Sequence, residues 1–206
     1  MLMDGILYLW LLWGIWVYTT FLLRKSHPDR FRYSFLSLLL ICVFPYGKMA
    51  GSVEVSYPVI VLALICIVYI RNLRLREKLY MLAVVLSMGM IYAGIALISI
   101  YDPVLMFMDR DIILSLSLVT VGILFYSHSS QFWIRLIAVA LSSVIGDFFL
   151  SIPLNKVGFH YSIGGPAYLD VLALTIGLLS ALKIVVEMNQ AVHIKTQPNK
   201  GEMKNL

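Results

Sequence analysis

Charged residues, cysteine and histidine are all scarce in this chain of 206 residues. Only 13% of the residues are charged, and the sequence holds two cysteines and four histidines. So low a charge content argues against an ordinary soluble domain. Cys42 and Cys66 both fall in apolar runs, which argues against a disulfide framework or a zinc site. No basic stretch is interleaved with aromatic residues in a polar segment, so we expect no nucleic-acid partner.

Apolar residues dominate the chain instead, at 61% of the sequence and in long blocks. A block that is apolar throughout favours a helix surrounded by lipid over a barrel strand, whose pattern would alternate. Most blocks approach the roughly 20 residues with which a helix crosses ~30 Å of hydrocarbon. We therefore predict an all-α, polytopic transmembrane helical bundle of about seven spans. The blocks are Gly5–Leu23, Tyr33–Ala50, Val53–Ile70, Leu79–Tyr101, Ile112–Tyr126, Ile134–Leu154 and Leu169–Val186.

Two parts of this division stay open. Ile112–Tyr126 is short for a span. The region Tyr33–Ile70 either crosses twice or forms a helical hairpin that does not fully cross, because polar residues and prolines interrupt it. These residues are Pro45, Lys48, Glu54 and Pro58. The first block follows Asp4 rather than basic residues, so we interpret it as a retained span and not as a signal peptide.

The basic residues are distributed unevenly between the connections. Only Lys48, Arg110 and Lys156, of 16 lysines and arginines, fall on one side of the predicted bundle. The other 13 are Arg24, Lys25, Arg30, Arg32, Arg71, Arg74, Arg76, Lys78, Arg135, Lys183, Lys195, Lys200 and Lys204. Because basic residues accumulate in cytoplasmic loops, the N-terminus is predicted outside and the C-terminus in the cytoplasm. A single transmembrane domain over 1–192 would precede a polar, disordered cytoplasmic tail over 193–206.

The densest polar stretch, "IGDFFLSIPLNKVGFHYSIGGPAYLD", includes an aspartate inside a predicted span. Asp147 lies three residues past the centre of Ile134–Leu154, or about 4.5 Å from the midplane. A carboxylate at this depth is costly unless it is paired, protonated or hydrated, so it should face the bundle. Its helical stripe carries small and polar residues, Ala140, Ser143 and Ser151. A proton or cation site, one acid of a catalytic pair, and a hydrogen bond that fixes helix packing all remain open.

His160 follows this span, among aromatic residues. Phe159, Tyr161 and Tyr168 favour an interfacial loop whose rings lie on the membrane surface. A sharper hypothesis groups His160 with Asp147 and Asp170 as a titrating cluster near the outer face. Alone, Asp170 is interpreted as a structural acid near the start of the last span. The candidate polar site is therefore Ser143, Asp147, Ser151, His160 and Asp170.

Motifs of known enzymes are largely missing. "YD" at Asp102 and "GD" at Asp147 resemble the catalytic aspartates of presenilin-like intramembrane proteases, but "VIGD" lacks the first glycine of their GxGD motif. The sequence contains no GxSG, HExxH or P-loop motif. We predict no catalytic residues, no cofactor and no metal. Small residues at Gly89 and Ala93, and at Ala173, Gly177 and Ala181, indicate faces on which helices pack closely.

The stretches "LYLWLLWGIWVYTTFLLRK" and "FHYSIGGPAYLDVLAL" resemble the YphA-like family of membrane proteins. The resemblance implies a multipass protein of the bacterial cell membrane, that is, the cytoplasmic membrane, and it carries no known activity or site. The leading interpretation is a non-catalytic accessory or interaction protein, with the lipid bilayer and other membrane proteins or a second copy as its partners. The alternative is a small transporter or channel subunit that uses Asp147 as a proton or cation site. An intramembrane enzyme is the third interpretation.

Overall fold

The computed structural model describes residues 4–196 apart from 26, 45, 51, 52, 103, 105 and 128–130, and for 48–50, 53 and 191–196 only the backbone. This part of the chain confirms the predicted helical class. Its elements are α1 (Ile6–Val17), η1 (Tyr18–Leu22, a π-helix), α2 (Arg30–Val43), β1 (Gly47–Ala50), β2 (Val53–Ser56), α3 (Tyr57–Arg71), α4 (Leu75–Tyr101), α5 (Arg110–Phe125), α6 (Phe132–Lys156) and α7 (Pro166–Thr196). Since α7 continues to Thr196, part of the predicted tail is helical; residues 197–206 lie outside the described residues.

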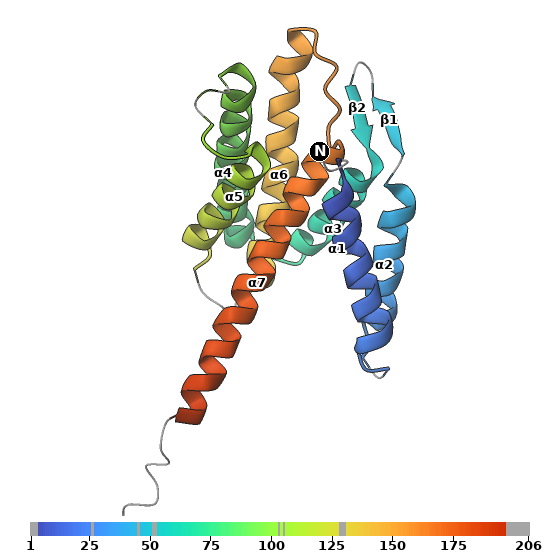
Figure 1. Ribbon diagram of the computed structural model, residues 1–206, viewed down its shortest axis with the longest axis vertical. Helices are drawn as coiled ribbons and strands as arrows, with labels where there is room; N and C mark the ends of the chain where they lie inside the picture. The colour runs from blue at the N-terminus through green and yellow to red at the C-terminus, as the bar shows by residue number, and fades with distance from the viewer. Residues whose placement is uncertain are drawn as a thin grey trace, which may run out of the picture.

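Helix α6 lies at the centre of the bundle, where it contacts α3, α4, α5 and α7. Helices α1 and α2 form an antiparallel pair beside this group, with α1 against α7 and α2 against α3 (Figure 1). At the end of α1 the chain makes a π-turn, and the guanidinium of Arg30 donates hydrogen bonds to the carbonyls of Thr19 and Thr20. This contact fixes the turn between the two helices.

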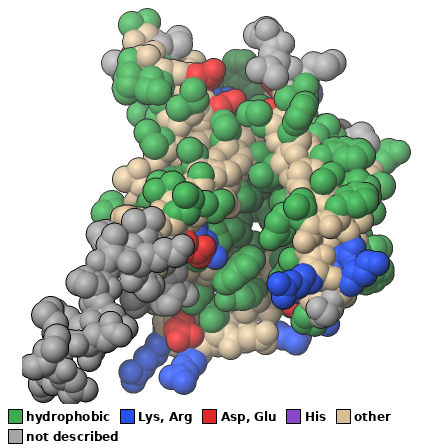
Figure 2. All heavy atoms as spheres, turned by 60° about the horizontal axis from the view of Figure 1, so that its bottom comes forward, with side chains coloured by type: hydrophobic (Ala, Val, Ile, Leu, Met, Phe, Trp, Pro, Cys, Tyr) green, Lys and Arg blue, Asp and Glu red, His purple; other side chains and the backbone are tan. Residues whose placement is uncertain are grey.

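The connections gather at two ends of the molecule. The hairpin, the α4–α5 connection and the α6–α7 connection lie at one end, and α7 projects beyond the other helices at the opposite end (Figure 1). Figure 2 shows most of the lysine and arginine side chains toward this second end, while the flanks are largely hydrophobic. Large apolar side chains on the flanks are strongly exposed, such as Trp10 at 75% and Leu124 at 74%. Such an exterior suits lipid and not water.

Within the described residues, three helices are long and apolar enough to cross a membrane: Leu75–Tyr101, Phe132–Lys156 and Pro166–Gln190. The apolar helices Ile6–Leu22 and Tyr57–Arg71 are shorter. The expectation that Tyr33–Ala50 and Val53–Ile70 are helical throughout is wrong, because α2 ends at Val43 and α3 begins at Tyr57. The segment between them contains the two strands.

The strands form an antiparallel hairpin in which Gly47 pairs with Ser56 and Ala50 with Val53. A segment of the α6–α7 connection extends this hairpin. The amide of Ser56 donates to the carbonyl of Ile163 (3.0 Å), and the amide of Ile163 donates to the carbonyl of Glu54 (2.8 Å). The hairpin is therefore attached to the connection that follows the polar span.

Glycines bring α4 and α6 into close contact. A Cβ at Gly146 would lie 2.9 Å from the carbonyl oxygen of Gly89, and a Cβ at Gly89 would lie 3.3 Å from that of Ser142. The predicted packing face at Gly89 is thus occupied by α6. On α7, Ala173 is buried, whereas nothing lies within 4 Å of a Cβ at Gly177, so only part of that stripe packs against described residues.

Candidate functional site

Asp147 is completely buried inside the bundle and accepts two hydrogen bonds. The hydroxyl of Tyr161 donates to its Oδ1 (2.5 Å), and the backbone amide of Gly164 donates to its Oδ2 (2.6 Å). Both donors belong to the connection after α6. The carboxyl group therefore fastens this connection to the middle of its own preceding helix.

The connection must turn back into the bundle to make these contacts. Asp147 lies nine residues before the end of α6 at Lys156, or roughly 13 Å along the helix axis. Asn155, near the end of α6, holds the first part of this turn, because its Oδ1 accepts a hydrogen bond from the amide of Tyr161 (3.3 Å). In Figure 1 the chain descends from the top of α6 and enters α7 well below that top. Gly164, at the end of the descent, has φ +72°, a conformation suited to glycine.

A positive charge and two unpartnered polar atoms lie near Asp147. Burial raises the pKa of the Tyr161 hydroxyl, and the Asp147 carboxylate raises it further, so Tyr161 stays protonated and can donate. The guanidinium of Arg110, at the start of α5, opposes this shift through its charge. Within the described part of the chain, the buried Tyr92 Oη and Arg110 Nε have no hydrogen-bond partner. Both atoms are donors that a water molecule or a polar ligand could satisfy.

The polar cluster ends near the middle of the bundle. The hydroxyls of Ser143 and Tyr168 are 2.9 Å apart, and Ser143 also donates to the carbonyl of Ala140. From this level toward the end that carries the basic connections, most of the described core is apolar, and the buried hydroxyls of Ser142 and Thr175 donate to carbonyls of their own helices. The buried apolar side chains here, each at most 3% exposed, are Met81, Val84, Val85, Met88, Leu118, Val119, Val139 and Leu179. Both hydrogen-bond donors of Asp147 thus come from the α6–α7 connection, and the buried hydroxyls on the other side of the bundle are satisfied within their own helices.

Asp170 is not part of this cluster. Its carboxylate accepts hydrogen bonds from the backbone amides of Gly5 (2.7 Å) and Tyr8 (3.0 Å) at the start of α1. These amides have no partner within their own helix, and a negative charge also suits the positive end of a helix dipole. Asp170 therefore joins the first and last helices, across 165 positions of sequence.

The other predicted site residues have separate surroundings. His160 is exposed and is not a hydrogen-bond partner of Asp147 or Asp170 in the described structure, so the three do not form the hypothesised cluster. Ser151 donates to the carbonyl of Phe148 in its own helix. Tyr168, expected at the membrane surface, is instead buried at 2% exposure. It points inward because its hydroxyl has a partner in Ser143.

The catalytic pair suggested by Asp102 and Asp147 is not assembled in the described residues. Asp102 is exposed and ends α4, and neither the hydrogen bonds nor the charged neighbours of Asp147 include it. A shared proton would require the two carboxyl groups to be in direct contact. Among the described residues, no group of three histidine, cysteine or acidic side chains is placed to hold a metal ion.

Sequence reasoning found Asp147 and missed its partners, Tyr161 and Gly164. An extended segment places alternate residues on opposite sides. In an extended "HYSIG" segment, Tyr161 and Ile163 point to one side and His160 points to the other. In the structure Ile163 is buried and His160 is exposed.

The comparison with known proteins identifies the family of this chain but no activity. No curated protein and no solved structure matches the chain. A family model described as YphA-like integral membrane protein matches residues 4–205, nearly the whole sequence. The chain belongs to the YphA-like family of integral membrane proteins.

Proposed function

We propose that this protein is a seven-span, non-catalytic accessory protein of the bacterial cytoplasmic membrane, in which Asp147 holds the fold together and carries no ion. The supporting observation is that both carboxylate oxygens of Asp147 accept hydrogen bonds from the protein itself, at a position with no exposed surface. A transport site must exchange its partner for an ion on both sides of the membrane. The apolar packing of Met88, Leu118 and Val139 supports a bundle closed on one side.

The proposed orientation places the basic end in the cytoplasm and the hairpin outside. Helices α1, α2, α3 and α5 are shorter than the roughly 20 residues of a regular span, and local thinning of the bilayer can accommodate them. Arginines and lysines at the cytoplasmic ends of short spans extend their charges to the headgroups. The placement of the connections at two ends of the molecule supports this arrangement (Figure 1).

Cysteine labelling tests the orientation. In a chain whose Cys42 and Cys66 are replaced by alanine, His160→Cys and Asn72→Cys put single thiols at exposed positions of opposite ends. A membrane-impermeant maleimide added to intact cells should label His160→Cys and should label Asn72→Cys only after lysis. Labelling of Asn72→Cys in intact cells would reverse the orientation. Labelling of both in intact cells would refute the span number.

Substitution of Asp147 tests the structural role. The amide of Gly164 can only donate, so any replacement must offer it an acceptor. Asparagine supplies one through its carbonyl oxygen, while its amide group can donate to the Tyr161 oxygen. Asp147→Asn should therefore accumulate in the membrane at near wild-type level. Asp147→Leu leaves the buried amide of Gly164 and the partly buried hydroxyl of Tyr161 without this partner, at a cost of about 1–3 kcal/mol for a fully buried donor, and should accumulate poorly.

Ion flux separates this proposal from the transporter. Protein reconstituted in vesicles containing a pH-sensitive dye should give no proton flux above that of empty vesicles, and Asp147→Asn should behave in the same way. Asp109→Asn, an exposed aspartate at the same end, is the control for a general effect of lost charge. Flux through the wild-type protein that Asp147→Asn abolishes and Asp109→Asn keeps would establish the transporter instead.

A further inference from the structure

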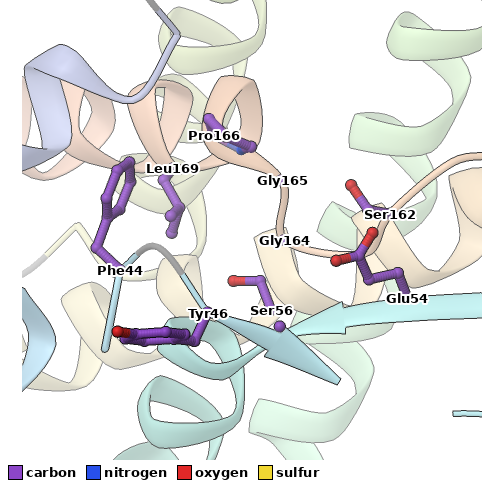
Figure 3. A pocket seen from close by; sticks show the side chains of 10 residues that line it. Phe44, Tyr46, Glu54, Ser56, Ser162, Gly164, Gly165, Pro166 and Leu169 are labelled. Carbon is purple, nitrogen blue, oxygen red and sulfur yellow. The ribbon is translucent and has the colours of Figure 1, made fainter. Parts of the chain in front are cut away.

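A pocket opens at the hairpin end of the molecule, and Gly164, whose amide binds Asp147, is one of its lining residues. Its volume is about 240 Å³, below the ~300 Å³ at which pockets for drug-sized ligands begin. The hairpin, the end of α2, the descending connection and the first turn of α7 form its walls. Figure 3 shows polar groups, Glu54 and Ser162, on one side and apolar groups, Phe44 and Leu169, on the other. We infer that this pocket binds a small zwitterion, an α-amino acid with an apolar side chain.

Glu54 is suited to hold the ammonium group. Its side chain is exposed at the pocket wall and makes no hydrogen bond or ion pair with the described side chains. Ser162 lies beside it and can accept a further hydrogen bond from an ammonium group (Figure 3). A carboxylate left unpaired at the wall of a concave pocket attracts a cation and repels a simple anion.

Ser56 is suited to bind the carboxylate group. It is the N-cap residue of α3, yet its hydroxyl makes no capping bond. One amide that such a hydroxyl usually binds belongs to the second helical residue, here Pro58, which has no N–H. The Ser56 oxygen is therefore buried at the pocket without a partner among the described residues. In Figure 3 it points toward the space between Tyr46 and Leu169.

The start of α7 adds a second feature that favours a carboxylate. Pro166 and Leu169, in its first turn, line the pocket. The amides of Ala167 and Tyr168 have no acceptor in the described structure, as expected at a helix start. These amides and the helix dipole favour a carboxylate at this wall, because the neighbouring Asp170 carboxylate is already bound by the amides of Gly5 and Tyr8. The two walls thus carry opposite polarity, which neither a simple cation nor a simple anion would match.

Phe44, Tyr46 and Leu169 complete the pocket with an apolar surface. A side chain such as that of leucine can bury its methyl groups against these residues, while a charged side chain would lose its hydration there. L-leucine is therefore the probe of choice. The inference goes beyond the accessory role, and it does not depend on the orientation in the membrane.

Calorimetry with the purified full chain in detergent micelles tests the inference. L-leucine should bind saturably, and leucinamide and N-acetyl-leucine, which each lack one charge, should bind at least about tenfold more weakly. Glu54→Gln should weaken leucine binding by about tenfold, the change expected on losing a charged hydrogen-bond partner. Ser56→Ala should weaken it less. Glu187→Gln, an exposed glutamate at the opposite end, should bind as the wild type does.

The controls keep the result interpretable. Thermal unfolding of each variant should match that of the wild type, since Glu54 and Ser56 make no side-chain hydrogen bond in the described fold. The absence of saturable leucine binding to the wild-type protein would overturn the inference. Equal binding of leucine and N-acetyl-leucine would also overturn it, as would unchanged binding by a folded Glu54→Gln variant.

Discussion

Gly164→Ala should strongly destabilise the protein, by about 2–5 kcal/mol. Gly164 has φ +72°, where an alanine Cβ meets its own backbone at a cost of about 1–2 kcal/mol. The added Cβ would also lie 2.1 Å from Cγ2 of Val59. Val59 is buried at 3% exposure, and its branched side chain has one preferred rotamer in a helix, so it cannot turn away. The connection would have to move instead, and the bond from Gly164 to Asp147 would stretch.

Gly158→Ala is the matched control for this substitution. Gly158 also has a positive φ, +91°, but nothing lies within 4 Å of a Cβ at this position. Only the backbone cost of about 1–2 kcal/mol should therefore remain. Thermal unfolding of the purified variants in detergent compares the two. Equal losses of stability would mean that the descending connection does not pack against α3 as described.

The hydropathy of the sequence predicted the long helices and failed at the hairpin. Blocks such as Leu79–Tyr101 are apolar over a full span, so their length and class follow from composition alone. The segment "VEVS" has only four residues, and it was included in the block Val53–Ile70 because the fourteen residues that follow it are strongly apolar. The alternation of Val53, Glu54 and Val55 was the available signal for a strand.

The position of Asp147 was predictable from the sequence, but its hydrogen-bond partners were not. A buried carboxylate demands partners, and the stripe of Ser143 and Asp147 gave its face of the helix correctly. Neither residue identifies the donors, because a stripe on one helix does not show which other segment of the chain packs against it. The contact of Asp170 with Gly5 depends on how the first and last helices are arranged, and periodicity within one helix carries no information about that.

Gly146→Ala and Gly94→Ala should change stability in opposite directions. Alanine is favoured over glycine inside a helix by about 0.5–1 kcal/mol, and nothing lies within 4 Å of a Cβ at Gly94 on α4. Gly94→Ala should therefore raise stability slightly. At Gly146 the same Cβ would lie 2.7 Å from Cδ1 of Tyr92 and 2.9 Å from the carbonyl oxygen of Gly89. The carbonyl is backbone, so the two helices must separate.

Separation of α4 and α6 would loosen the surroundings of Asp147 as well. Tyr92, which has no exposed surface, packs between Gly146 and the ring of Tyr168, at 6.5 Å between ring centroids. A shift at this crossing would admit water to the polar cluster from the side that is now sealed. Overpacking of this kind destabilises a protein by about 1–3 kcal/mol, which exceeds the stabilisation of about 0.5–1 kcal/mol that alanine gives over glycine inside a helix. Thermal unfolding in detergent should place Gly146→Ala below the wild type and Gly94→Ala at or above it. A Gly146→Ala variant as stable as Gly94→Ala would falsify the close crossing of α4 and α6, and with it the sealed position of Asp147.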